Sequence, residues 1–132
     1  MREILFRGKR KNTGEWLEGN YVHASEGEGT YEYEQHFIQI VPRYGGLGAA
    51  YEVIPETVGQ WTGLTDKNGK KIFEGDIVYN GSGDPGIVKW FYGSFVIHFT
   101  NGDVWDVSQY IKEEYTEVIG NIHDNPELLE VK

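Results

Sequence analysis

The chain has 132 residues, enough for one compact domain, or one domain with an appended lobe, that buries a core without covalent cross-links. It contains no cysteine, which excludes disulfides, thiolate nucleophiles and cysteine-ligated zinc or iron–sulfur sites. The formal net charge of −9 opposes contact with a phosphate backbone, and so it disfavours duplex DNA as a partner.

The composition favours short strands joined by tight turns. Glycine occurs 18 times and aromatic residues make up 14% of the chain, while no window sustains the 3.6-residue period of a long amphipathic helix. The N-terminus lacks the apolar core of a signal peptide, and no apolar run approaches the roughly 18 residues of a membrane helix. We therefore expect an all-β cytoplasmic protein that does not enter a membrane, with no helix longer than about two turns.

An N-terminal β-hairpin is predicted first. Residues 3–7 and 15–23 flank Lys11-Asn12-Thr13-Gly14, in which asparagine and glycine favour the positive φ of a tight turn. Residues 25–30, SEGEGT, are small, polar and glycine-rich, and they are expected to form a loop.

Residues 31–41 alternate as a strand does, with apolar side chains on both faces. One face carries Tyr31, Tyr33, Phe37 and Val41, and the other carries Glu32, Glu34, Ile38 and Ile40. This pattern predicts an edge strand or an interface, and a homo-oligomer that buries one of the two faces. The competing interpretation is a monomer in which the hairpin and the remaining fold cover the strand completely.

Residues 42–50 combine proline with glycines and show no periodicity, and they indicate a boundary between an N-terminal lobe and the rest of the chain. A short strand at 51–54 and a helical turn opened by Pro55 follow. We accordingly divide the chain into an N-terminal β-lobe, 1–54, and a second part, 55–132.

The second part has the spacing of a small barrel. After a turn at Asn68-Gly69, five apolar runs recur about every ten residues, with further turns at Asn80-Gly81, Tyr92-Gly93 and Asn101-Gly102. The runs are 73–78, 86–91, 94–99, 103–107 and 116–122. A helical turn within 108–114 would link the last two, as in many SH3-like barrels, and a short helix at 124–129, with Asn125 as N-cap, would close the chain.

Alternation also predicts which side chains face inward. We expect Phe95, Ile97 and Phe99 to lie inside, opposite Val88 and Trp90 on the neighbouring strand.

Three segments carry a resemblance to a known family. They are REILFRGKRKNTGEWLEG near the start, ETVGQWTGLTDKNGKKIFEGDIV in the middle and EVIGNIHDNPELL near the end. In this order they resemble the YopX-like family of bacteriophage and prophage proteins of unknown function. The resemblance implies an SH3-like barrel and a phage or prophage gene, and it brings no catalytic residues. Residues 23–50 show least of the family pattern, so a ligand-specific or host-specific role would lie there.

Two glycine-containing motifs are better interpreted as turns. Residues 81–86 satisfy GxGxxG, but a strand rather than a helix follows and Asp84 would repel a phosphate. Residues 66–70 resemble the start of a calcium loop, but Lys70 occupies a ligand position. We expect no cofactor at either motif.

No catalytic residues are predicted either. The four histidines show no HxH or HExxH spacing, and no serine lies in a GxSxG motif. His98, Asp103 and Asp106 could converge across a hairpin to hold a metal, but strand histidines at a surface are commoner. The expectation is a non-enzymatic protein without a metal site.

Two features bear on the partner. Trp90, Tyr92 and Trp105 could stack single-stranded bases, but no basic groove accompanies them. Packing in the core or at an interface is the favoured interpretation, because Trp90 alternates with Lys89 and Phe91 as a buried strand residue would. The first eleven residues hold five of the twelve basic side chains: Arg2, Arg7, Lys9, Arg10 and Lys11. We interpret these as a solvated strand edge. The expected function is that of a phage or prophage accessory protein that binds a host or phage protein in the cytoplasm of the host cell. The alternative is a nucleic-acid-associated regulator that uses the basic hairpin.

Overall fold

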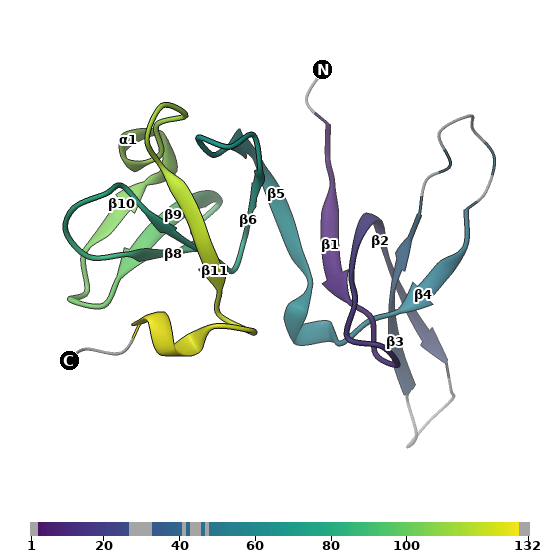
Figure 1. Ribbon diagram of the computed structural model, residues 1–132. Helices are drawn as coiled ribbons and strands as arrows, with labels where there is room; N and C mark the ends of the chain where they lie inside the picture. The colour runs from purple at the N-terminus through teal and green to yellow at the C-terminus, as the bar shows by residue number, and fades with distance from the viewer. Residues whose placement is uncertain (1–2, 27–32, 41, 43–45, 47, 130–132) are drawn as a thin grey trace. The chain divides into compact units, whose positions relative to one another are not determined.

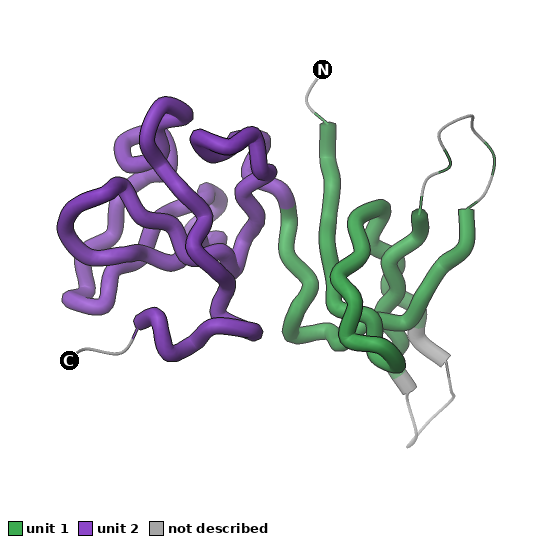
Figure 2. The backbone as a smooth tube through the Cα atoms, in the orientation of Figure 1, with its two compact units in different colours: residues 1–60 green, residues 61–132 purple. Residues whose placement is uncertain are grey.

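The computed structural model describes residues 3–26, 33–40, 42, 46 and 48–129. The chain forms two compact units, Met1–Gln60 (unit 1) and Trp61–Lys132 (unit 2) (Figure 2). The boundary between them falls within the strand Gly59–Thr65. The sequence placed a boundary six residues earlier, between 54 and 55.

Unit 1 is an antiparallel sheet with the strand order β4-β3-β2-β1-β5 (Figure 1). Its elements are β1 (Phe6–Lys9), β2 (Trp16–Glu26), β3 (Tyr33–Gln39), β4 (Ala50–Glu52), the 3₁₀ turn η1 (Pro55–Thr57) and the first residues of β5 (Gly59–Thr65). The predicted N-terminal hairpin is confirmed, since β1 and β2 pair from Phe6↔Gly19 to Lys9↔Trp16 around a turn in which Gly14 has φ +74°. The predicted loop begins later than expected, because β2 continues to Glu26; residues 27–30 of that loop lie outside the described residues.

Strand β3 is not the free edge that the sequence suggested. It pairs with β2 along Tyr33–Gln39 and with β4 along Phe37–Gln39. Ile38, which was expected to seek a partner, is completely buried within unit 1. Because Ile38 is buried, Ile38→Glu would disrupt the core of unit 1 and could not serve as a test of self-association. Tyr31, Glu32 and Val41, which were placed on the same strand, lie outside the described residues, and the homo-oligomer stays a prediction.

Two glycines let β1, β2 and β3 approach closely around Ile38. A Cβ atom on Gly19 would lie 2.1 Å from the Gln39 carbonyl oxygen, and one on Gly8 would lie 3.1 Å from side-chain atoms of Ile38 and Val53. Val53, like Ile38, is almost fully buried. The small core of unit 1 thus depends on the absence of side chains at these two positions.

Unit 2 contains a five-stranded antiparallel sheet with the order β10-β9-β8-β7-β11. Its elements are β6 (Lys71–Phe73), which pairs with β5, β7 (Asp76–Tyr79), β8 (Gly86–Phe91), β9 (Ser94–Phe99), β10 (Val104–Asp106), α1 (Val107–Tyr110), β11 (Glu117–Asn121) and the 3₁₀ turn η2 (Pro126–Leu129). The all-β class is confirmed. In the described part of the chain no helix exceeds four residues.

The core of unit 2 includes side chains of β9, and two of the three that were predicted to face inward are buried. Phe95 and Ile97 are buried and pair with Trp90 and Val88 in the expected register. Phe99 is only partly buried against this core. The prediction for Trp90 is wrong, because half of its surface is exposed even though its ring packs edge-on against Phe95 at 4.8 Å. Trp90 lies near the tip of the β8–β9 hairpin, where it pairs with Phe95 one step before the turn.

The turn between β5 and β6 has the expected backbone. Gly69 has φ +78°, and a Cβ atom there would meet nothing within 4 Å. Gly102 and Gly81 also have positive φ, and the Tyr92-Gly93 turn has positive φ at both residues. The cost of a side chain at Gly69 would therefore come from backbone strain alone.

We predict that Gly69→Val lowers the free energy of unfolding by about 1–3 kcal/mol, because a β-branched residue is strained at positive φ. Gly69→Asn is the matched control and should cost clearly less, since asparagine tolerates this conformation. Urea denaturation of both variants and the wild type measures the difference. Equal midpoints for the valine and asparagine variants would contradict the explanation.

Candidate functional site

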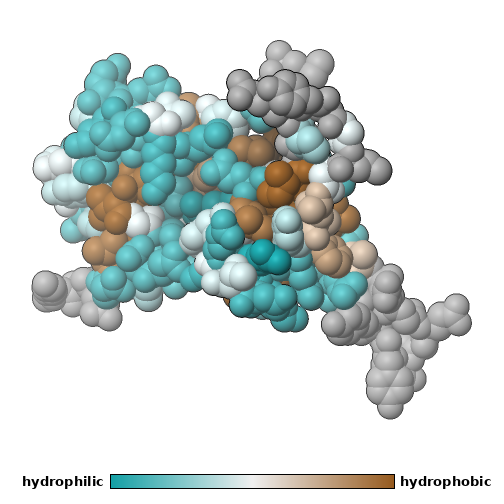
Figure 3. All heavy atoms as spheres, turned by 45° about the vertical axis from the view of Figure 1, so that its right-hand side comes forward, coloured by the Kyte–Doolittle hydropathy of each residue, from teal (hydrophilic) through white to brown (hydrophobic). Residues whose placement is uncertain are grey.

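The exposed aromatic residues of unit 2 form two groups. Trp90, Phe91 and Tyr92 occupy the tip of the β8–β9 hairpin, where Tyr92 is 93% exposed. Trp105 on β10 and Tyr115 after α1 are each about half exposed. On the face shown in Figure 3, hydrophobic residues, drawn in brown, lie in patches among hydrophilic ones. Trp90, Tyr92 and Trp105 are therefore not buried in the core, and their packing at an interface stays a prediction.

The second group borders an open pocket of about 590 Å³ within unit 2. The β7–β8 loop, the β9–β10 hairpin and the segment from α1 to β11 each contribute residues to its wall. The residues that line it are Asn80, Ser82, Gly83, Asp84, Phe99, Asn101, Asp103, Trp105, Gln109, Tyr110 and Tyr115. Four aromatic side chains and two carboxylates thus share one concave surface.

Edge-on aromatic contacts build the apolar side of the pocket. The ring of Phe99 meets that of Trp105 at a centroid distance of 6.4 Å and that of Tyr110 at 5.1 Å. The Tyr110 hydroxyl is buried and has no hydrogen-bond partner among the described residues. Burial accordingly raises the pKa of Tyr110 above its ordinary value of 10.0. The pocket wall therefore holds a neutral phenol with an unused donor.

Helix α1 is fixed at its N-terminus by Asp106. Its carboxylate accepts hydrogen bonds from the backbone amide and the hydroxyl of Ser108, and Gln109 completes a capping box. These bonds, the one from the Ser108 hydroxyl first, lower the pKa of Asp106 below its ordinary value. The Asp106 carboxylate thus has a structural role. In the described part of the chain His98, Asp103 and Asp106 do not form a group whose ligand atoms lie within 4.8 Å of one another.

A hydrogen-bonded pair anchors the other end of α1. The Asn80 side chain donates to the Tyr110 carbonyl at 2.8 Å and accepts from the Thr116 hydroxyl. Thr116 is completely buried, and its hydroxyl also accepts from the Lys112 amide. Asn80 and Thr116 therefore hold the helix, and with it Tyr110, against β7 and the start of β11.

Asp66 connects the β5–β6 turn to the same region. Its buried carboxylate accepts backbone hydrogen bonds from Asn68 and Lys70, at 2.9 Å each, and from Val118 at 3.0 Å. Burial alone would raise the pKa of Asp66, but the bonds from Val118, Lys70 and Asn68 outweigh it, and the pKa lies below the ordinary 3.8.

In unit 1 the described basic residues of the hairpin lie against aromatic or acidic groups. The Arg7 guanidinium is buried 4.7 Å from the Trp16 ring centroid, and the Lys9 ammonium lies 5.9 Å from the same ring. Arg10 lies 4.3 Å over the ring of Tyr51. Lys11 pairs with Glu52 at 3.4 Å. Arg2 lies outside the described residues.

The comparisons with known proteins decide the family. The family model described as YopX protein matches residues 5–130. This chain belongs to the YopX family. No curated protein matches it. A crystal structure of protein EF1440 from Enterococcus faecalis is 24% identical, with a TM-score of 0.58 over 98% of this chain and 100% of that one. At this identity the likeness concerns the fold alone.

The segments that carried the resemblance now have structural explanations. TDKNG contains the Asp66 turn, and in FEGD the Asp76 carboxylate accepts from the Phe73 amide at 2.7 Å. In VIGNIHDNP a Cβ atom on Gly120 would lie 2.6 Å from the Asn125 side-chain oxygen, which accepts from the Asn121 amide. The motif residues stabilise turns and close contacts, and the pocket draws on other positions for its aromatic wall.

The sequence analysis did not assign Phe99, Tyr110 or Tyr115 to a pocket. Tyr110 lies within the predicted helical turn and Tyr115 directly after it, and so the two tyrosines at that turn were the available signal. Within the described ranges no helix is long and apolar enough to span a bilayer.

We predict that stability falls as the pH drops through the lowered pKa of Asp66. A carboxylate with a depressed folded pKa stabilises the fold above its unfolded pKa, and that contribution is lost in acid. Asp66→Asn should lower the free energy of unfolding at neutral pH by about 1–3 kcal/mol, because charged hydrogen bonds are lost, and should make its acid dependence shallower. Urea denaturation across a pH series measures both effects.

The control is Asp84→Asn, which changes an exposed aspartate of the same unit. An unchanged pH dependence in Asp66→Asn, or an equal change in Asp84→Asn, would contradict the role given to Asp66.

Proposed function

We propose that this YopX family member is a non-enzymatic phage or prophage accessory protein that binds a host or phage protein in the cytoplasm. The observation that carries the proposal is the open pocket of unit 2, where Trp105 and Tyr115 are exposed beside Phe99 and Tyr110. Half-exposed tryptophan and tyrosine side chains are characteristic of surfaces that bind other proteins.

The pocket chemistry favours a particular kind of segment. Flat aromatic rings pack well against apolar side chains and proline rings. The carboxylates of Asp84 and Asp103 also line the pocket and would attract a basic group. The net charge of −9 adds a long-range attraction for basic partners. The proposed ligand is therefore an extended peptide segment with apolar and basic residues.

We also propose that unit 2 folds as an SH3-like barrel. The strand order β10-β9-β8-β7-β11 and a single helical turn before the last strand support it. Small barrels of this kind commonly bind peptides in aromatic-lined grooves.

We predict that Trp105→Ala combined with Tyr115→Ala weakens binding of the partner by more than about tenfold, because central aromatic residues dominate interface energies. The partner is captured from host cells on immobilised wild-type protein, purified, and titrated by calorimetry against both forms.

The matched control is Tyr92→Ala, which removes an exposed aromatic residue at the other group. It should leave the affinity unchanged. A purified partner that binds the double variant as tightly as the wild type, or that responds only to Tyr92→Ala, would overturn the assignment to the pocket.

Duplex DNA should not bind appreciably at physiological salt. The net negative charge opposes counterion release, and Arg7, Arg10 and Lys11 already have intramolecular partners. We predict a dissociation constant weaker than about 10⁻⁶ M by fluorescence anisotropy of a labelled duplex at about 150 mM salt. Tighter binding that is lost in Arg10→Ala would instead favour the nucleic-acid-associated regulator.

A further inference from the structure

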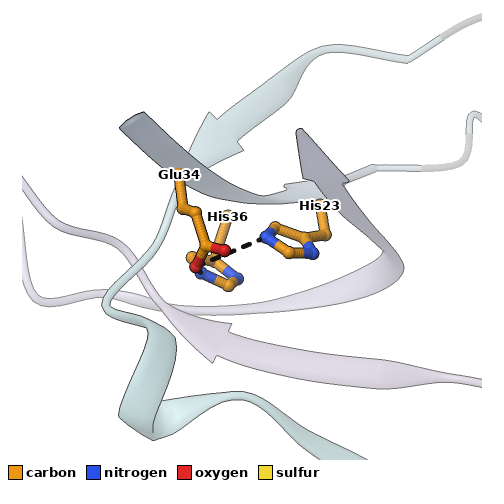
Figure 4. Close-up of side chains that lie close together, drawn as sticks. All are labelled: His23, Glu34 and His36. Atoms are coloured by element: carbon orange, nitrogen blue, oxygen red, sulfur yellow. Dashed lines mark ion pairs between the residues drawn. The ribbon is translucent and has the colours of Figure 1, made fainter. Parts of the chain in front are cut away.

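The β2–β3 hairpin of unit 1 brings His23 on one strand together with Glu34 and His36 on the other. His23 on β2 and His36 on β3 are direct cross-strand partners. Glu34 lies two residues before His36, and alternation puts both side chains on the same face of β3. Figure 4 shows the three side chains pointing toward one another from the two strands.

The distances among the three groups fit a metal better than direct hydrogen bonding. One oxygen of Glu34 lies 3.7 Å from His23 Nε2 and 4.0 Å from His36 Nε2, both too long for a hydrogen bond. One ligand atom from each residue lies within 4.8 Å of the others. Ligands of a tetrahedral zinc ion, at bond lengths of about 2.0–2.1 Å, are roughly 3.4 Å apart. A contraction of up to about 1.4 Å would bring the ligand atoms to this spacing, together with a rotation of the stacked imidazole rings that turns both Nε2 lone pairs toward one point.

Tyr21 orients His36, the less exposed of the two histidines. The Tyr21 hydroxyl bonds to His36 Nδ1, which leaves Nε2 directed at Glu34. The rings of Tyr21, His36 and His23 are nearly parallel, with centroid distances of 5.9 Å and 4.5 Å between neighbours. When Nδ1 carries the proton and donates it to Tyr21, the Nε2 lone pair of His36 is available to a metal. Such outer partners are a regular feature of histidine ligands.

Solvent reaches the cluster chiefly at Glu34 and His23. The side chains of Glu34 and His23 are 60% and 44% exposed, while that of His36 is 16% exposed. An ion could therefore enter without opening the fold, and a fourth position would remain for water or another ligand. Two imidazoles with one carboxylate are donors that zinc and neighbouring transition metals prefer, whereas magnesium and calcium prefer oxygen alone.

We propose that His23, Glu34 and His36 bind one divalent transition-metal ion, zinc by preference, across the β2–β3 hairpin. The ion would join the two strands by coordination bonds to their side chains. It would lie within residues 23–50, the part of the chain with least of the family pattern.

Calorimetric titration of untagged, chelator-treated protein with zinc chloride tests the proposal. We expect one ion per chain, and no binding heat with magnesium chloride. His23→Gln and Glu34→Gln should each weaken binding by more than about tenfold. Tyr21→Phe, which keeps all three ligands, should weaken it by about 10–100-fold, the usual effect of losing an outer partner.

His98→Gln is the matched control, since it removes a strand histidine of unit 2. It should bind zinc as the wild type does. Long-range proton–nitrogen spectra of the wild-type protein provide a test independent of the variants, because zinc should shift the ring nitrogens of His23 and His36 and leave those of His98 unchanged. No stoichiometric binding, an equal loss in His98→Gln, or unchanged His23 and His36 resonances would each overturn the site.

Discussion

The hydrogen bonds to the buried carboxylate of Asp66 are the interactions on which the arrangement of the strands and turns of unit 2 depends. This carboxylate satisfies two amides of its own turn and one of β11, and so a local hairpin and a strand fifty residues later share one charged acceptor. Beside it, the Lys67 amide donates to the carbonyl of Thr116, whose hydroxyl bonds to Asn80. Asn80 in turn holds the end of α1. The pocket wall is thus connected to the turn by continuous hydrogen bonding.

The sequence was most informative where local chemistry determines the backbone. Asn-Gly pairs and spaced apolar runs located the turns and strands of unit 2, because positive φ and the two-residue alternation are properties of a few neighbouring residues. The burial of Ile38 and the exposure of Trp90 were missed, since both depend on which strands lie alongside. For Ile38 the decisive residues were Gly8 and Gly19, whose importance appears only when three strands are placed together.

The candidate sites illustrate the same division. Glu34 and His36 share a strand face by simple alternation, but the pairing of His36 with His23 requires the hairpin register, which a polar, glycine-rich loop does not specify. The pocket collects residues from three separate segments, so no linear motif could reveal it. Asp106 was considered as a metal ligand, and its neighbours Ser108 and Gln109, in the pattern of a capping box, were the signal that it begins a helix instead.

The stacking of Arg7 and Lys9 on Trp16 has a spectroscopic consequence. Trp16 is the single tryptophan among residues 1–60, whereas Trp61, Trp90 and Trp105 belong to unit 2. Its indole lies beneath a cationic side chain, while the indoles of Trp90 and Trp105 are about half exposed to water. Replacing the other three tryptophans with phenylalanine would leave an intrinsic fluorophore whose emission follows the melting of the N-terminal sheet alone. The protein thus contains its own optical label for asking whether its two halves unfold in one step or two.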